Sequence, residues 1–230
     1  MPSSVRRPGT PGRNLGAQGG AVFIDGSALF LHSRALYPGQ LDYGALTSLI
    51  TEAYPDVGAP ALRSATNVWA MWTSHAPQNE GQSRFIDFVE KRLHWQVRGF
   101  SPSDSYLVDP VVVFGMAADT RSASSRLVRF DPAIAYAIGR LADMHRIVVV
   151  SDSFGLAEPL ARVAQEHPDR KPVLAFFGQA LDSRWQRRLR TEPEMSPEFL
   201  DLDEHVERLY GIPSSSIKPV QSVEQGVRSF

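Results

Sequence analysis

The feature that most constrains this chain is an apolar strand that ends in a carboxylate. Residues 21–24 are all apolar, and Asp25 and a glycine follow them directly. An unbroken apolar run of this kind is typical of a parallel strand that is buried on both faces. A second run, 147–150, leads in the same way to Asp152. Because open α/β sheets bind ligands outside the carboxyl ends of their strands, the two acids predict a shared site at one sheet edge.

Strand and helix patterns alternate along the rest of the chain. Further strands are expected at 67–73, 95–100, 110–114 and 172–177, and helices at 41–53, 84–93, 131–143, 156–166, 181–189 and 199–210. This alternation predicts an α/β fold, namely a Rossmann-like three-layer sandwich with a mostly parallel central sheet of about five strands and helices on both faces.

The ends of the chain differ in composition from its middle. Residues 1–20 are rich in Gly, Pro, Ser and Arg and contain no hydrophobic segment, so we expect a disordered tail and no secretion signal. A second flexible tail is expected at 213–230. The remaining residues, 21–212, suit one domain with a sizeable core.

Composition excludes several classes of protein. The chain has no cysteine, which rules out disulfide scaffolds, thiolate zinc sites and cysteine nucleophiles. The 24 Lys and Arg residues balance 25 Asp and Glu residues, so the net charge points to no nucleic-acid or membrane partner. No apolar run approaches the roughly 20 residues that span a bilayer. We therefore expect a cytoplasmic protein with no membrane partner.

A third acid stands at a predicted helix start. Asp131 precedes a proline, a combination that favours the first turn of a helix, and this helix leads into the run 147–150. Three converging carboxylates repel one another, and a hard divalent cation such as Mg²⁺ or Mn²⁺ would hold them together. Such a cation can activate water and offset the charge that develops on a scissile phosphate.

These segments resemble the NYN domains of the PIN-like nuclease superfamily. Residues 23–27 look like the opening strand of that family, 129–131 like its acidic helix start, and 148–154 like its later strand with an acid. The resemblance spans about 21–177. It implies a PIN-like fold and a metal-dependent ribonuclease in which Asp25, Asp131 and Asp152 bind Mg²⁺ or Mn²⁺ and carry catalysis.

The chain also departs from that family. Ala28 replaces an Asn, Arg129 and Phe130 replace Lys and Gly, and Phe154 replaces a further acid. A catalytically degenerate domain that binds RNA or another protein therefore stays open as a second function. A phosphatase of the haloacid-dehalogenase type is a third, although Ser27 stands where those enzymes carry their second Asp.

Other polar residues are candidates for binding substrate. Ser27 and Ser151 are placed to hydrogen-bond the carboxylates or a metal-bound water. Arg121, Arg126 and Arg129 lie in the loop before the third acid, where phosphate contacts require Arg or Lys. The expected partner is RNA, and a second copy of the chain or another protein is also considered.

Each of these assignments has a structural alternative. Taken singly, the three acids are also explained as helix caps. Asp119 is either a fourth acid or a loop residue. The arginines at 184, 187, 188 and 190 with Trp185 are either a nucleic-acid surface or the solvated face of a helix, and Trp69 and Trp72 are expected in the core.

Overall fold

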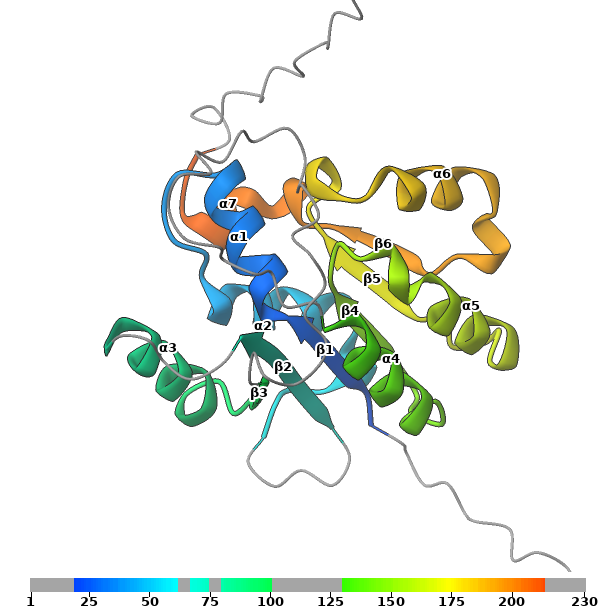
Figure 1. Cartoon of the computed structure of the whole chain (residues 1–230), viewed down its shortest axis with the longest axis horizontal. Helices are drawn as coiled ribbons and strands as arrows, with labels where there is room; N and C mark the ends of the chain where they lie inside the picture. Colours follow the sequence, from blue (N-terminus) through cyan, green and yellow to red (C-terminus); the bar gives the residue numbers. More distant parts are fainter. Residues whose placement is uncertain (1–18, 62–66, 75–79, 101–129, 214–230) are drawn as a thin grey trace, which may run out of the picture.

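The computed structural model describes residues 19–61, 67–74, 80–100 and 130–213. Its centre is a sheet of six parallel strands in the order β3-β2-β1-β4-β5-β6 (Figure 1). The strands are β1 (Ala21–Asp25), β2 (Val68–Ser74), β3 (Gln96–Phe100), β4 (Ile147–Val150), β5 (Val173–Phe176) and β6 (Glu198–Asp201). The predicted α/β fold is confirmed, with one strand more than the expected five.

Helices cover this sheet. They are α1 (Gly26–Leu36), α2 (Tyr43–Ala53), α3 (Glu80–Lys91), α4 (Asp131–Arg140), α5 (Ala157–Glu166), α6 (Ser183–Thr191) and α7 (Val206–Tyr210). In Figure 1, α4 and α5 lie in front of the sheet and α2 lies behind it. This arrangement is the expected Rossmann-like three-layer sandwich.

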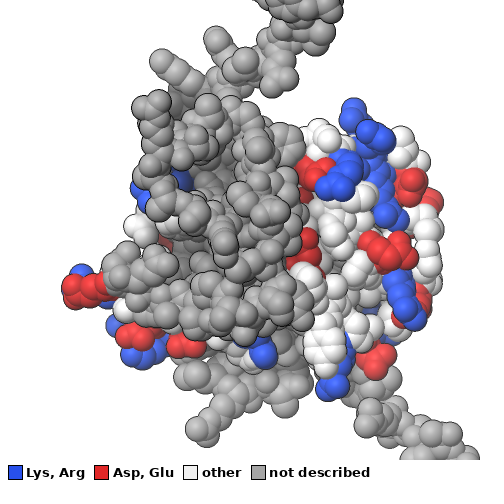
Figure 2. Space-filling view, viewed as in Figure 1, with Lys and Arg blue, Asp and Glu red and all other residues white. Residues whose placement is uncertain are grey.

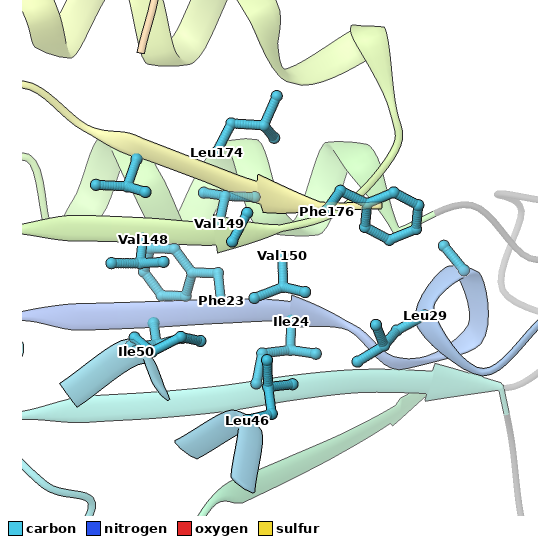
Figure 3. Packing of buried hydrophobic residues seen from close by; sticks show 14 of the residues in the cluster. Phe23, Ile24, Leu29, Leu46, Ile50, Val148, Val149, Val150, Leu174 and Phe176 are labelled. Atoms are coloured by element: carbon cyan, nitrogen blue, oxygen red, sulfur yellow. The ribbon is translucent and has the colours of Figure 1, made fainter. Parts of the chain in front are cut away.

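The two central strands are buried along their whole length. Every residue of β1 and β4 is buried, because helices cover both faces of the sheet. Figure 3 shows how Phe23 and Ile24 of β1 lie among the valines of β4 and the α2 residues Leu46 and Ile50. Burial on both faces is the physical reason why these strands are continuous apolar runs in the sequence.

Two predicted helix starts have different outcomes. Asp42 caps α2, since its Oδ1 accepts the N–H groups of Gly44 and Ala45 at 2.8 and 3.0 Å. Asp131 does not cap α4. The N-cap is Phe130, and Asp131 is the first residue of the helix. The Asp131 carboxylate instead accepts a hydrogen bond from the hydroxyl of Ser153, in the loop after β4.

The prediction of one helix over 199–210 was wrong at its start. Residues 198–201 form β6, which pairs with β5 in the register Val173 to Glu198, and a 3-10 turn, Leu202–His205, follows. Only the last part of the predicted segment is helical, as α7, which ends at Gly211 in a left-handed conformation with φ of 64°. Pairing with the edge of β5 outweighs the local helical pattern.

The folded region begins slightly before the predicted boundary. The carbonyl of Gly19 accepts the N–H of His145 at 3.2 Å, and that of Gly20 accepts the N–H of Val68 at 2.9 Å. The predicted strand 110–114 and the remainder of the N-terminal tail lie outside the described residues, as does the C-terminal tail beyond Pro213. Among the helices that the structure describes, none combines the length and apolar character needed to cross a membrane.

Candidate active site at the carboxyl edge of the sheet

The acids lie near the point where the strand order of the sheet reverses, between β1 and β4. From β1 the chain passes to β2 on one side, and it later returns to place β4 on the other side. Ile24 of β1 pairs with Val150 of β4, so the next positions, Asp25 and Ser151, are neighbours across the two strands. This is the topological switch point, which is where open α/β sheets bind their ligands.

Asp25 is a buried acid. Only 4% of the residue is exposed, and its Oδ1 accepts the N–H of Ala28 at 2.9 Å, so the interpretation of Asp25 as a helix cap is confirmed. The pKa of Asp25 is raised from 3.8 to about 7, chiefly because the carboxyl is buried. The charges of Asp152 and Asp131 contribute to this rise, and the N–H groups of Ala28 and Ser27 oppose it. Asp131 and Asp152 are therefore each close enough to Asp25 to interact with it electrostatically.

Asp131 is tied to the loop after β4. Its Oδ2 accepts the hydroxyl of Ser153 at 2.5 Å, and the same hydroxyl oxygen accepts the N–H of Gly155 at 3.1 Å. A Cβ added to Gly155 would lie 2.6 Å from Asp131 Oδ2. A side chain at position 155 would therefore require the Asp131 carboxylate to shift.

Asp152 pairs with a histidine that sequence reasoning missed. Its Oδ2 lies 3.1 Å from Nε2 of His32, and the two side chains are 28% and 11% exposed respectively. The His32 ring also packs edge-on against Phe176 of β5, with centroids 5.4 Å apart. His32 follows Asp25 by seven residues, about two helical turns, and that spacing along α1 was the available signal.

The alternative in which Asp152 caps the next helix was wrong, because Ser153 caps the 3-10 turn Phe154–Leu156.

We refer to Asp25, Asp131 and Asp152 as the acid site. They come from three elements, and each is held by a different group: the Ala28 N–H, the Ser153 hydroxyl and the His32 ring. A set of carboxylates suits Mg²⁺ or Mn²⁺ chemically. However, within the described ranges no three or more His, Asp or Glu side chains are arranged to hold a metal ion. Side-chain rotation would have to precede cation binding.

The two predicted serines lie in this region. Ser151 is fully buried, and its Oγ accepts the N–H of Ser153 at 3.2 Å, so it shapes the loop after β4. Ser27 is partly buried in the first turn of α1. The predicted substrate residues Arg121, Arg126 and Arg129 lie outside the described residues, as does Asp119.

Helix α6 is anchored to the acid site. The indole Nε1 of Trp185 donates to the carbonyl of Ser153 at 2.9 Å, and Trp185 has no exposed surface. The Trp185 ring packs edge-on against Phe154, with centroids 5.3 Å apart. Trp185 is thus a core residue and cannot stack on a nucleic-acid base. Trp69 and Trp72 are also buried, as expected.

A cavity of about 530 Å³ lies at the opposite, amino end of the sheet. It is lined by the starts of β2 and β3, including Trp69 and Trp95, whose rings stack at 5.7 Å. Within the described part of the chain, Nε1 of Trp95 and Nδ1 of His94 are buried without a hydrogen-bond partner. None of the three acids lines this cavity, so it is separate from the acid site.

Comparisons with known proteins bear on the fold. No protein-family model matches the chain, and a search of curated proteins gives no match. The crystal structure of a protein of unknown function from Vibrio parahaemolyticus is similar, with a TM-score of 0.53 and 13% identity, over 84% of this chain and 96% of that one. A likeness at this identity shows a shared fold alone, and the chemistry of the acid site has to be argued from its own residues.

Proposed function

We propose that this chain is a Mg²⁺- or Mn²⁺-dependent ribonuclease that hydrolyses phosphodiester bonds at the acid site. One observation carries the proposal: three acids from three elements lie near the topological switch point, where Asp131 and Asp152 each act electrostatically on the buried Asp25 and Asp131 contacts Ser153, the neighbour of Asp152. Burying a carboxylate beside two others is costly unless a cation or a proton offsets the charge. A site that gathers such acids is suited to a divalent cation.

The residues of the chain would contribute in different ways. A bound cation would supply a polarised water and offset the charge on the phosphate. Asp152 is more exposed than Asp25, with 28% of its side chain accessible against 4% of residue Asp25, so Asp152 would be the acid that substrate reaches first. For the three acids to act together, Asp131 has to leave the Ser153 hydroxyl and Asp152 has to leave His32.

A degenerate domain that binds RNA or a protein without cleavage is the second candidate. It is favoured by the contacts just described, because each acid already has a protein partner that needs no cation. Phe154 adds to it, since the residue two positions after Asp152 supplies no oxygen ligand. The two candidates differ in one measurable property, namely cation-dependent turnover.

The test is cleavage of a labelled single-stranded RNA by the full chain with added Mn²⁺. A cation stabilises the transition state by several kcal/mol, so Asp25→Asn and Asp152→Asn are each expected to slow cleavage about 100-fold or more. Asp87→Asn is the matched control, because Asp87 is an exposed acid of α3 that pairs with Lys91. It should cleave as the wild type does.

Two outcomes would reject the ribonuclease. Cleavage that persists in both acid-site variants would come from another source. No cleavage by the wild-type chain, together with a melting temperature that Mn²⁺ leaves unchanged, would favour the degenerate domain, because a ligand that binds the folded state must stabilise it.

A further inference from the structure

We infer that the exposed arginines of α6 form a phosphate-binding surface that guides a single-stranded RNA toward the acid site. This inference deepens the proposed function and rests on it for the identity of the substrate. The surface consists of Arg184, Arg187 and Arg190, which we call the α6 arginine strip. It was one of two interpretations that the sequence left open.

The strip begins beside the acid site because of two contacts of the first turn of α6. Trp185 donates its indole N–H to the Ser153 carbonyl, and Ser153 itself donates to Asp131. The guanidinium of Arg184 lies over the ring of Phe154, 4.8 Å from its centroid. A single loop, 152–155, therefore carries one acid of the site, contacts a second acid and supports the start of the strip.

Phe154 gains a role from this arrangement. Arg184 pairs with Asp182 at 2.7 Å, which fixes its orientation. An acid at position 154 would add a second carboxylate beside Arg184, whereas the aromatic ring supports the guanidinium through its π face and adds no negative charge. The phenylalanine thus holds Arg184 at the edge of the acid site, and the charges of the strip that have no acidic partner among the described residues are those of Arg187 and Arg190.

The rest of the strip is exposed and rich in unpaired charge. Arg184, Arg187 and Arg190 are spaced three residues apart, so they follow one another along the side of α6 away from the buried Trp185. Six residues of helix extend over about 9 Å. In the described part of the chain, Arg187 and Arg190 have no carboxylate within ion-pair distance, whereas Arg188 lies 3.6 Å from Glu192 and is left out of the strip.

The whole helix carries a single sign of charge. The sequence of α6 contains four arginines and no acid. Figure 2 shows Lys and Arg side chains on the upper right of this face, where α6 lies in Figure 1. Such a surface is suited to bind the phosphates of a single-stranded RNA, because each Arg can donate two hydrogen bonds to one phosphate. Buried Trp185 offers no base contact, so we expect little sequence preference.

The experiment measures binding separately from cleavage. A fluorescein-labelled single-stranded RNA of twenty nucleotides is titrated by anisotropy with the Asp25→Asn chain, without added metal, at several salt concentrations. In this background Arg187→Gln with Arg190→Gln should weaken binding on the order of tenfold. The slope of log affinity against log salt should become shallower by about 1.4, the value for two lost phosphate contacts on a single strand.

The matched control removes two charges elsewhere. Arg140→Gln with Arg162→Gln changes an exposed arginine at the end of α4 and one on α5 that pairs with Glu166. This double variant should bind as its Asp25→Asn parent does. Equal losses in both double variants would mean that overall charge and not the strip binds RNA, and they would overturn the inference. Unchanged binding in the α6 variant, or no binding by the parent, would overturn it too.

The same titrations separate this inference from the ribonuclease. If the parent binds RNA through the strip while the wild-type chain with Mn²⁺ leaves it intact, the surface stands and the ribonuclease fails. If the wild-type chain cleaves RNA while the α6 variant binds and cleaves normally, the ribonuclease stands and the surface fails. An acidic protein that binds in place of RNA would also overturn the inference.

Discussion

Acids stand at the carboxyl ends of the sheet in two regions, and their surroundings differ. At β6, Asp201 Oδ1 accepts the N–H groups of Gly178 and Asp203 at 3.0 and 2.9 Å. Asp203 accepts the Tyr37 hydroxyl at 2.5 Å and the Gln179 N–H at 2.8 Å. We call Asp201 and Asp203 the β6 acid pair. Each acid of this pair has at least two donors.

Asp25 of the acid site is more deeply buried and has more acids close to it. Only 4% of Asp25 is exposed, and both Asp152 and Asp131 raise its pKa, whereas in the β6 acid pair Asp201 alone raises the pKa of Asp203 by its charge. An acid at a strand end therefore does not by itself mark a functional site. The balance between buried charge and available donors separates a structural acid from one that is suited to bind a cation.

The largest expected effect tests the buried charge of Asp25. Its pKa is about 7 in the folded protein and near 3.8 when unfolded, so the folded state binds more protons between these values. The free energy of unfolding therefore falls as the pH rises from about 4 to 7. Asp25→Asn removes this loss and should be more stable than the wild type by roughly 2–4 kcal/mol at pH 8, with little difference at pH 4.

Urea unfolding at both pH values measures this difference. Asp42→Asn is the control for the loss of a capping oxygen, since Asp42 caps α2 on the surface. A gain of the same size at pH 4 and pH 8 would show that the charge is not the cause, and the contrast with the β6 acid pair would lose its basis.

A smaller effect of opposite sign is expected in the β6 acid pair. Asp203→Ala leaves the Tyr37 hydroxyl and the Gln179 N–H without their acceptor, which should lower the free energy of unfolding by about 2 kcal/mol. Tyr37→Phe removes one side of the same contact and should cost about 1 kcal/mol. If Asp203→Ala were as stable as the wild type, the β6 acid pair would not be structural. The proposed difference between the two groups of acids would then be wrong.

The smallest effect tests the connection between α6 and the acid site. Trp185→Phe keeps an aromatic ring in the core but loses the donor to the Ser153 carbonyl, and we expect a cost of about 1 kcal/mol in urea unfolding. Leu189→Val on the same face of α6 is a packing control that keeps the indole hydrogen bond. Should Trp185→Phe prove neutral, the loop 152–155 would not depend on α6 for its position.

Much of the fold could be read from local patterns. The apolar runs of β1 and β4 follow from burial on both faces, and the cap of α2 and the helical faces of α2 and α5 follow from side-chain chemistry within each segment. The strand β6 could not be predicted in this way. Residues 198–201 are partly exposed and short, and they become a strand because the edge of β5 offers them hydrogen bonds.

The same division holds for the acid site. Asp25 and Asp152 were predictable because an acid that ends a buried parallel strand must lie at the carboxyl edge of the sheet. The pairing of His32 with Asp152 spans 120 residues of sequence, and that of Ser153 with Asp131 joins a loop to a helix start. The seven-residue spacing from Asp25 could have placed His32 near this edge of the sheet, but no spacing rule connects His32 to Asp152 or Ser153 to Asp131, so these two pairings were not predictable.

By itself, the sequence determined which strands are buried and that two of them end in carboxylates, because hydrophobic pattern and residue type act locally along the chain. Tertiary structure alone decided how each acid is held, how strongly Asp25 is desolvated and where the arginines of α6 lie relative to the acid site. Burial and hydrogen bonding are properties of groups brought together from distant segments, and they exist only after the sheet and its helices have packed.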